Sequence, residues 1–265
     1  MTAGLGATVV LALNARVGLF SLPGWVDLHL SWALLGWAGV LLLGMGFQLV
    51  PLFHVTPPYP AWFRRDAPTI LFLALLGMTA GHVADNGLLR WIGVASGLAL
   101  LATFAVLTLR LQAARRRPVR DPTLLFWWVG LACLLGAVAA WFFDAPGTLI
   151  GALALAGAGV AIPSGVLYKV VPFLAWFHLQ AVQIERARLD IAVPHVKSYV
   201  SDRFAYAHFA LHVASLALML VALAGWEIAA RPAGLLFAAA ALLQGANLFR
   251  VYIRLREVRR LLEAA

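Results

Sequence analysis

The chain has 265 residues, of which 63% are hydrophobic and 12% are charged, and its formal net charge is +9. Ordinary soluble domains are roughly 45–50% apolar, so this composition predicts an integral membrane protein. The basic residues cluster in short loops between apolar stretches, which argues against nucleic-acid binding as the reason for the positive charge. The single cysteine, Cys133, excludes an internal disulfide and a cysteine-ligated zinc or iron–sulfur site formed by this chain alone.

Apolar stretches long enough to cross a bilayer, roughly 20 residues each, recur along the whole chain. All are predicted to be helices, because an open sheet cannot satisfy its backbone hydrogen bonds in lipid. The first is short and carries Asn14 and Arg16. The prediction is an all-α integral membrane protein with about eight spans, near residues 3–20, 27–52, 67–84, 88–111, 122–143, 147–176, 204–224 and 232–254.

Basic residues follow every second span, and the alternate loops hold few of them. The positive-inside rule then places both termini in the cytoplasm. The predicted location is the bacterial inner membrane, with the lipid bilayer as surroundings. The basic residues that decide the orientation are Arg64, Arg65, Arg115, Arg116, Arg117, Arg120, Arg186, Arg188, Lys197, Arg203, Arg254, Arg256, Arg259 and Arg260.

A weak internal repeat is visible at the ends of two spans. "GFQLVPLFHV" (46–55) and "LYKVVPFLAWFHLQ" (167–180) share an aromatic residue, a polar residue and a Val-Pro pair in the same order. The match predicts two repeat units, 1–117 and 118–265, within a single membrane domain. Chance recurrence of Val-Pro in apolar sequence is the alternative. Gln48 and Lys169 are equivalent in this alignment. Lys169 is interpreted either as a functional residue, namely a proton relay or a partner of a haem propionate, or as a cation that reaches the cytoplasmic interface.

Ionisable side chains inside a membrane usually face a bundle interior, a partner or a cofactor, and neutral imidazole is a good ligand for haem iron, copper and zinc. His29 and His82 are predicted at the outer side, whereas His54 lies roughly 37 Å along an unbroken helix from His29. The small residues Ala33 and Gly36 follow His29 and would let a flat macrocycle approach the backbone, although small residues also serve helix packing.

Residues 29–60 resemble the second helix of subunit I of haem–copper oxidases. The matching features are His29, "GMGFQ" (44–48), "LVPL" (49–52) and the proline-rich "TPPYP" (56–60). The resemblance implies that His29 ligates a b-type haem, with His82 as the candidate second axial ligand. It also implies two tandem four-helix arcs like part of that subunit, a plan shared by NnrS-type relatives linked to nitric oxide.

The oxidase motifs that bind copper, and the later His-x-His motif, are missing from the sequence. Reduction of dioxygen at a haem–copper centre is therefore not expected. No Cys-x-x-Cys-His motif is present, which excludes covalent c-type haem attachment to this chain.

A second, inner site is predicted on the basic side. His208 and His212 are four residues apart and share one helical face, a spacing suited to two ligands of one metal. His178 and His54 end spans on the same side and are predicted to complete the site for a second haem or for copper, zinc or iron. An interfacial position of His178 is the alternative, and His195 is interpreted as a loop residue.

The predicted function is a haem-binding membrane protein for electron transfer or for a response to a diatomic gas such as nitric oxide. A transporter or assembly factor for a metal or haem is the alternative. A quinone, a partner redox subunit or a second copy of the chain are the partners that such a protein would use.

Overall fold

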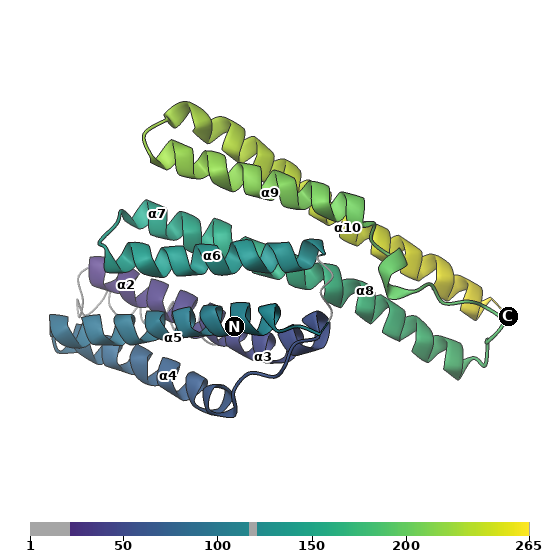
Figure 1. Cartoon of the computed structure of the whole chain (residues 1–265), viewed down its shortest axis with the longest axis horizontal. Helices are drawn as coiled ribbons and strands as arrows, with labels where there is room; N and C mark the ends of the chain where they lie inside the picture. Colours follow the sequence, from purple (N-terminus) through teal and green to yellow (C-terminus); the bar gives the residue numbers. More distant parts are fainter. Residues whose placement is uncertain (1–21, 117–120, 265) are drawn as a thin grey trace. The chain divides into compact units, whose positions relative to one another are not determined.

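The computed structural model describes residues 22–116 and 121–264, and the chain divides into two compact units. Unit 1 is Met1–Arg117 and unit 2 is Pro118–Ala265 (Figure 1). This boundary falls where the sequence placed the boundary between the repeat units, but their origin by duplication stays a prediction. The predicted first span, 3–20, lies outside the described residues.

Unit 1 contains a long interrupted helix followed by a helical hairpin. The elements are α2 (Leu22–Ser31), the π-helical segment η1 (Trp32–Gly39), α3 (Val40–His54), α4 (Ala61–Val83) and α5 (Gly87–Ala113). The turn between α4 and α5 contains Asp85 with a positive φ of 48°, and the Asn86 side chain caps α5 by accepting a hydrogen bond from Leu89 N–H.

The α4–α5 hairpin packs closely because glycines stand where the helices cross. A Cβ added at Gly93 would lie 2.5 Å from the Met78 backbone nitrogen, and one at Gly81 would lie 2.5 Å from the Arg90 nitrogen. Close backbone approach through small residues is the usual way in which membrane helices associate.

Unit 2 contains a helix followed by a long interrupted helix and a hairpin, and the last two come in the same order as in the described part of unit 1. Its elements are α6 (Pro122–Phe142), α7 (Gly147–Gly151), the π-helical segment η2 (Ala152–Gly159), α8 (Val160–Glu185), the 3₁₀ turn η3 (Val196–Ser198), α9 (Asp202–Leu223), the 3₁₀ turn η4 (Glu227–Ala229) and α10 (Ala230–Glu263).

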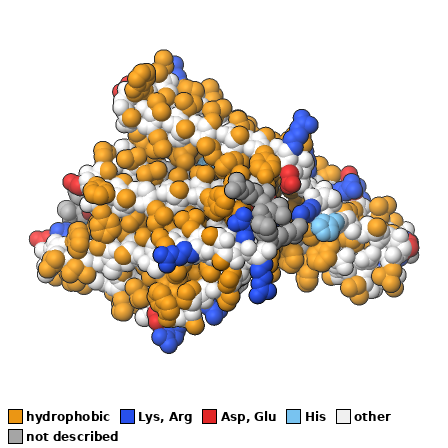
Figure 2. Space-filling view, viewed as in Figure 1, with side chains coloured by type: hydrophobic (Ala, Val, Ile, Leu, Met, Phe, Trp, Pro, Cys, Tyr) orange, Lys and Arg blue, Asp and Glu red, His pale blue; other side chains and the backbone are white. Residues whose placement is uncertain are grey.

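Within the described residues, seven helical runs are long and apolar enough to cross a membrane, and large hydrophobic side chains are exposed over the surface (Figure 2). The protein is thus an all-helical, multi-pass membrane protein, as predicted, whereas the oxidase-like arcs stay a prediction. The runs are Val26–His54, Ala61–Val83, Gly87–Ala113, Pro122–Phe142, Gly147–Glu185, Asp202–Leu223 and Glu227–Glu263.

Two of these runs continue well beyond the predicted span ends, to Glu185 instead of 176 and to Glu263 instead of 254. Loss of hydropathy marks the edge of the apolar layer, but a helix continues until a capping residue or a breaker stops it. The extra turns of α8 and α10 pack together around their own hydrophobic cluster, which includes Ala175, Leu179 and Val258.

Within the described residues, each unit has one eight-residue π-helical segment, η1 in unit 1 and η2 in unit 2, and both lie in the long helix that contains the Val-Pro pair. Each ends about three turns before the proline of the Val-Pro pair, Pro51 in α3 and Pro172 in α8. Long π segments are rare and widen the helix locally. Their matched positions support the proposed repeat.

Candidate functional site

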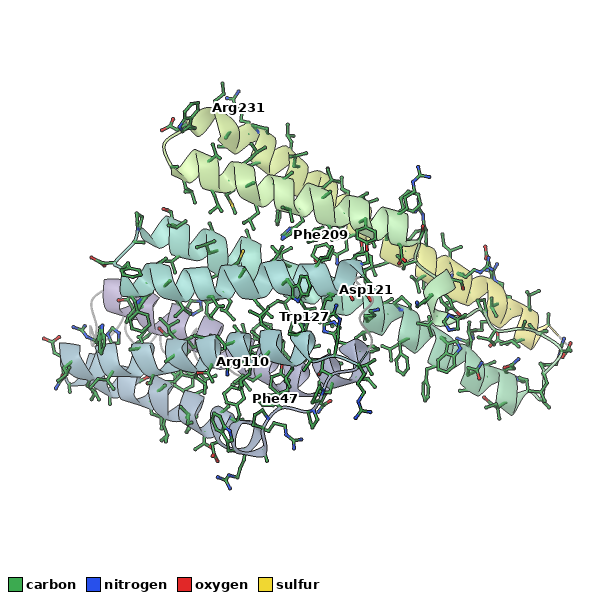
Figure 3. The ribbon with its side chains drawn as sticks, viewed as in Figure 1. Phe47, Arg110, Asp121, Trp127, Phe209 and Arg231 are labelled. Atoms are coloured by element: carbon green, nitrogen blue, oxygen red, sulfur yellow. The ribbon has the colours of Figure 1, made fainter. Side chains whose placement is uncertain are left out.

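A cluster of buried polar side chains lies inside unit 2, on three of its helices. His208 and His212 on α9 are each 1% exposed, and Tyr168 on α8 and Asn247 on α10 are also buried. Phe209, labelled in Figure 3, marks this part of α9. The two imidazoles are one helical turn apart, as the sequence predicted from their spacing. We call these four residues the polar cluster.

Hydrogen bonds join three members of the polar cluster. Tyr168 Oη lies 3.0 Å from His208 Nδ1, and Asn247 Nδ2 donates to the same Oη at 3.0 Å. When His208 carries its proton on Nδ1 and donates to Tyr168, its Nε2 lone pair is available to a ligand. Tyr168 therefore orients His208 much as an outer-shell partner orients a metal-binding histidine.

The His212 imidazole differs, because neither ring nitrogen has a hydrogen-bond partner. Its ring packs near Phe126, with a centroid distance of 5.8 Å, and the His208 ring packs on the same phenyl group at 4.8 Å. Leaving a buried polar group without a partner costs about 1–3 kcal/mol. A side chain in this state calls for a physical explanation, and an electron-pair acceptor such as a metal ion supplies one.

Two further hydrogen bonds fix the helices around the polar cluster. Ser215 Oγ donates to the Ala233 carbonyl at 2.9 Å and so ties α9 to α10. Ser164 Oγ donates to Gln244 Oε1 at 3.2 Å and so ties α8 to α10, while Gln244 Nε2 is a second buried atom without a partner.

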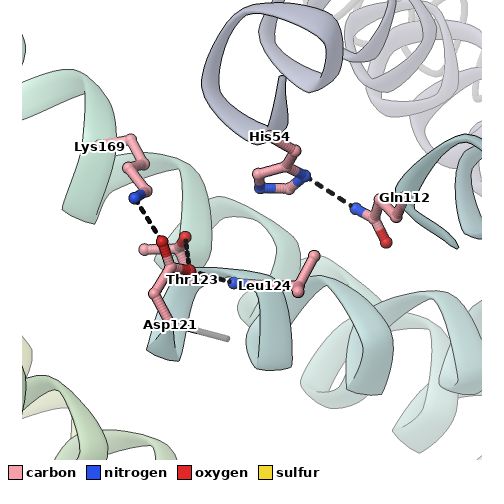
Figure 4. Close-up of polar contacts among 6 residues, drawn as sticks. All are labelled: His54, Gln112, Asp121, Thr123, Leu124 and Lys169. Atoms are coloured by element: carbon pink, nitrogen blue, oxygen red, sulfur yellow. Dashed lines mark hydrogen bonds and ion pairs between the residues drawn. The ribbon is translucent and has the colours of Figure 1, made fainter. Parts of the chain in front are cut away.

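The end of unit 2 near the polar cluster carries a partly buried ion pair (Figure 4). Lys169 Nζ lies 2.5 Å from Asp121 Oδ2, while Thr123 Oγ1 and Leu124 N–H donate to Asp121 Oδ1 at 2.6 and 3.0 Å. Burial favours a higher pKa of the Asp121 carboxyl, but the hydrogen bonds from Lys169 and Thr123 outweigh it and hold that pKa below its ordinary value. Lys169 therefore anchors α8 to the start of α6.

His54, predicted as a member of the inner metal site, is engaged within unit 1. It is 7% exposed, and its Nδ1 accepts a hydrogen bond from Gln112 Nε2 at 3.0 Å (Figure 4). This bond joins the end of α3 to the end of α5, which is a role in packing unit 1.

His178, predicted as the third ligand of the inner site, is exposed on α8 and lies near enough to Glu263 for their charges to interact. It is roughly 15 Å along the helix from Tyr168, because α8 continues past the level of the polar cluster. The described residues contain no group of three or more His, Cys, Asp or Glu side chains that could hold a metal ion. The predicted gathering of His178 with His208 and His212 is therefore not observed.

His29 and His82, the predicted outer pair, lie at the end of unit 1 that is opposite to His54. Asp27 lies near enough to His82 for their charges to interact, so the start of α2 does approach the end of α4. Leu28 is buried, however, and its neighbours Asp27 and His29 point to opposite sides of it because successive helical residues differ by about 100°. His29 is exposed.

The small residue Gly36, expected beside a macrocycle, lines an open apolar groove of about 390 Å³ on unit 1. The Trp32 indole in this groove donates to Thr79 Oγ1 at 3.0 Å. The groove residues are Trp32, Gly36, Trp37, Val40, Leu41, Phe72 and Leu75.

Comparison with protein-family models, with curated proteins and with solved structures finds no match to this chain. The resemblance to haem–copper oxidases therefore rests on the sequence of residues 29–60 and stays a prediction.

The sequence analysis did not predict a role for Asn247 or Gln244. In the structure, Asn247 belongs to the polar cluster and Gln244 hydrogen-bonds the nearby Ser164. A signal for them exists, because both are uncharged polar residues one turn apart in the apolar stretch "LLQGANLF" (242–249). Polar residues within a membrane span usually face a bundle interior.

Proposed function

We propose that the protein is a membrane metalloprotein of the redox class, whose metal ion or haem iron is held by His212 with His208 beside it. The observation that carries this proposal is the His212 imidazole, buried to 1% exposure with both ring nitrogens unpartnered. Imidazole nitrogen is a preferred ligand of iron, copper and zinc, and coordination replaces the missing hydrogen bond.

The side chains of the polar cluster are suited to hold a metal ion or a haem iron. Tyr168 supplies the oriented second-shell contact to His208, and Phe126 supplies an apolar wall that excludes water from both imidazoles. When bound, the metal would supply one-electron chemistry inside the membrane, and the described side chains would hold it and set its surroundings.

His208 and His212 lie on one face of one helix, so they cannot occupy the two opposite axial positions of a single haem. The pair suits one metal ion, or a haem bound by one of the two imidazoles. The b-type haem at His29 remains a proposal that rests on the oxidase-like sequence. The location of both termini in the cytoplasm of a bacterial inner membrane remains a proposal that rests on the basic residues of alternate loops.

Transport or assembly is the second candidate function, and one observation favours it. Only two candidate imidazole ligands meet in the polar cluster, and Tyr168 and Asn247 offer only weaker oxygen or amide donors. A site with two strong ligands releases its metal more easily than a site with three or four, which suits transient carriage of a metal or haem.

Absorption spectra of the purified protein, oxidised and reduced, together with metal analysis, test the proposal. The proposal predicts one equivalent of haem or metal at the polar cluster, in addition to any haem at His29, and a His208→Ala, His212→Ala double variant should lose more than nine tenths of that equivalent. His195→Ala is the matched control, because this exposed loop histidine should leave the content unchanged. A double variant with the parent's haem and metal content would refute the proposal, and a substoichiometric labile metal in the parent would favour transport.

A further inference from the structure

The polar cluster is connected to the surface of unit 2 by a series of hydrogen bonds. Arg250 is exposed on α10, where its guanidinium lies 4.4 Å from the centroid of the Phe204 ring, and its Nη1 donates to Asn247 Oδ1 at 3.4 Å. Asn247 Nδ2 donates to Tyr168 Oη, and this oxygen lies 3.0 Å from His208 Nδ1. We call Arg250, Asn247, Tyr168 and His208 the hydrogen-bond relay.

The chemistry of Arg250 fixes the direction of the first two bonds of the hydrogen-bond relay. A guanidinium has five donors and no acceptor, so the Asn247 atom that faces it must be the amide oxygen. The amide nitrogen of Asn247 then faces Tyr168, and an amide nitrogen only donates. The Tyr168 hydroxyl oxygen therefore accepts a hydrogen bond from Asn247, whatever His208 does.

The bond between Tyr168 and His208 can run in two directions, and burial decides between them. If His208 Nδ1–H donated, the Tyr168 hydroxyl hydrogen would have no acceptor, because Oη has no other partner among the described residues. Tyr168 is buried, so an unpartnered hydroxyl hydrogen is costly. If Tyr168 donates to His208 Nδ1, each bond is satisfied. The accepting nitrogen of a neutral imidazole carries no hydrogen, so the hydrogen of His208 lies on Nε2.

This tautomer decides which of the two histidines can bind a metal. A metal ion needs a lone pair, and a ring nitrogen that carries hydrogen has none to offer. His208 Nε2–H is instead a hydrogen-bond donor, and within the described residues it has no partner. Neither ring nitrogen of His212 has a partner, so this imidazole still offers a lone pair. Both rings pack on Phe126, which places the donor and the lone pair beside the same apolar side chain.

We propose that His212 alone of the two histidines ligates the metal, and that His208 Nε2–H donates a hydrogen bond to a small molecule bound to that metal. This inference rests on the proposed function and names its ligand class. The ligand is a small molecule that binds a metal and accepts a hydrogen bond, as diatomic molecules and azide do. A molecule of the same size without an acceptor would leave the buried N–H unpartnered, so His208 selects against it. Tyr168, Asn247 and Arg250 are positioning residues for this donor.

Metal and haem analysis of single variants separates a metal ligand from a hydrogen-bond donor. His208→Leu should keep the metal or haem equivalent of the polar cluster, whereas His212→Leu should lose it. Loss of that equivalent from His208→Leu as well would overturn this inference, because His208 would then be a ligand, and the proposed function would stand. Retention by both variants would refute the proposed function itself.

Azide titration of the purified protein measures the hydrogen bond from His208. His208→Leu should bind azide about tenfold more weakly, since it lacks the donor to a charged ligand. His208→Gln is the matched control, because its side-chain amide keeps an N–H donor but is a poor metal ligand, and it should bind azide nearly as tightly as the parent. Equal azide affinities of the parent and His208→Leu would overturn the inference.

Nitrogen-15 NMR of the full chain with labelled histidine tests the hydrogen-bond relay, even if a substitution of His208 fails to fold. In the parent, His208 should carry its hydrogen on Nε2. Arg250→Glu should move it to Nδ1, because a carboxylate only accepts, so the Asn247 amide turns round and every bond reverses. Arg256→Glu is the matched control, since this exposed arginine of α10 bonds Tyr252 instead. A parent with hydrogen on Nδ1, or an unchanged tautomer in Arg250→Glu, would overturn the relay.

Discussion

Units 1 and 2 place an aromatic residue at the same point of their long helices, four residues before the proline of the Val-Pro pair, but surround it differently. In unit 1 this residue is Phe47, which packs edge-on against Tyr59, Phe63 and Phe104. In unit 2 it is Tyr168, which hydrogen-bonds His208 and Asn247. One helical frame thus holds an apolar cluster in one unit and a polar cluster in the other.

The difference shows where chemistry can reside in this protein. Unit 1 has buried polar side chains too, but its buried histidine is hydrogen-bonded, since His54 Nδ1 accepts from Gln112 Nε2, and its buried Tyr59 bonds to Thr108. In unit 2, by contrast, both ring nitrogens of the buried His212 imidazole lack a hydrogen-bond partner. Among the described residues, unit 2 is thus the unit that offers a ligand a buried imidazole whose ring nitrogens lack hydrogen-bond partners.

The largest expected effect concerns helix packing. Gly93→Ala in unit 1 should destabilise the fold by about 3 kcal/mol, because the added methyl group meets the Met78 backbone, which cannot move without separating α4 from α5. Gly136→Ala in unit 2 meets only the end of the Leu153 side chain, at 3.5 Å, which is ordinary van der Waals contact, and it should cost less. Thermal unfolding in detergent measures both.

Gly44→Ala is the control, since nothing lies within 4 Å of its added Cβ. It should be neutral or should stabilise by about 0.5–1 kcal/mol, because alanine favours the helix more than glycine does. Equal losses of stability at Gly93 and Gly44 would show that the close helix crossing does not hold unit 1 together.

The sequence predicted the spans in the described chain and the shared face of His208 and His212, because both follow from local periodicity. It did not predict the partners of His208, because Tyr168 and Asn247 come from other helices and their meeting depends on tertiary register. It also expected His178 at the depth of the pair. The side of the membrane follows from loop charge, but depth depends on how far α8 continues before it ends.

The second prediction compares the two buried tyrosines. Tyr168→Phe should destabilise the fold by about 2 kcal/mol, since both Asn247 Nδ2 and His208 Nδ1 lose a hydrogen-bond partner. Tyr59→Phe should cost clearly less, because Thr108 Oγ1 still donates to the Phe104 carbonyl at 2.7 Å. Thermal unfolding of the two variants side by side measures the difference. A larger loss for Tyr59→Phe would mean that the hydrogen bonds of Tyr168 with His208 and Asn247 contribute less than the single bond of Tyr59 with Thr108.

The last and smallest effect concerns the ion pair of unit 2. Asparagine is as good a helix N-cap as aspartate, so Asp121→Asn keeps the cap of α6 and removes only the charge that faces Lys169. The partly buried pair should contribute about 1 kcal/mol at neutral pH. Asp66→Asn is the control in unit 1, where the exposed pair with Arg65 should give no measurable change.

Acid should remove the same contribution. The folded state holds the pKa of Asp121 below its ordinary value of 3.8, so the unfolded chain takes up a proton first as the pH falls. The stabilisation is therefore complete above about pH 5 and disappears as the pH drops through the folded pKa. Unfolding midpoints of the parent and of Asp121→Asn, measured from pH 6 to pH 3, should converge at the acid end. A constant difference over that range would show that the carboxylate charge of Asp121 does not stabilise the start of α6.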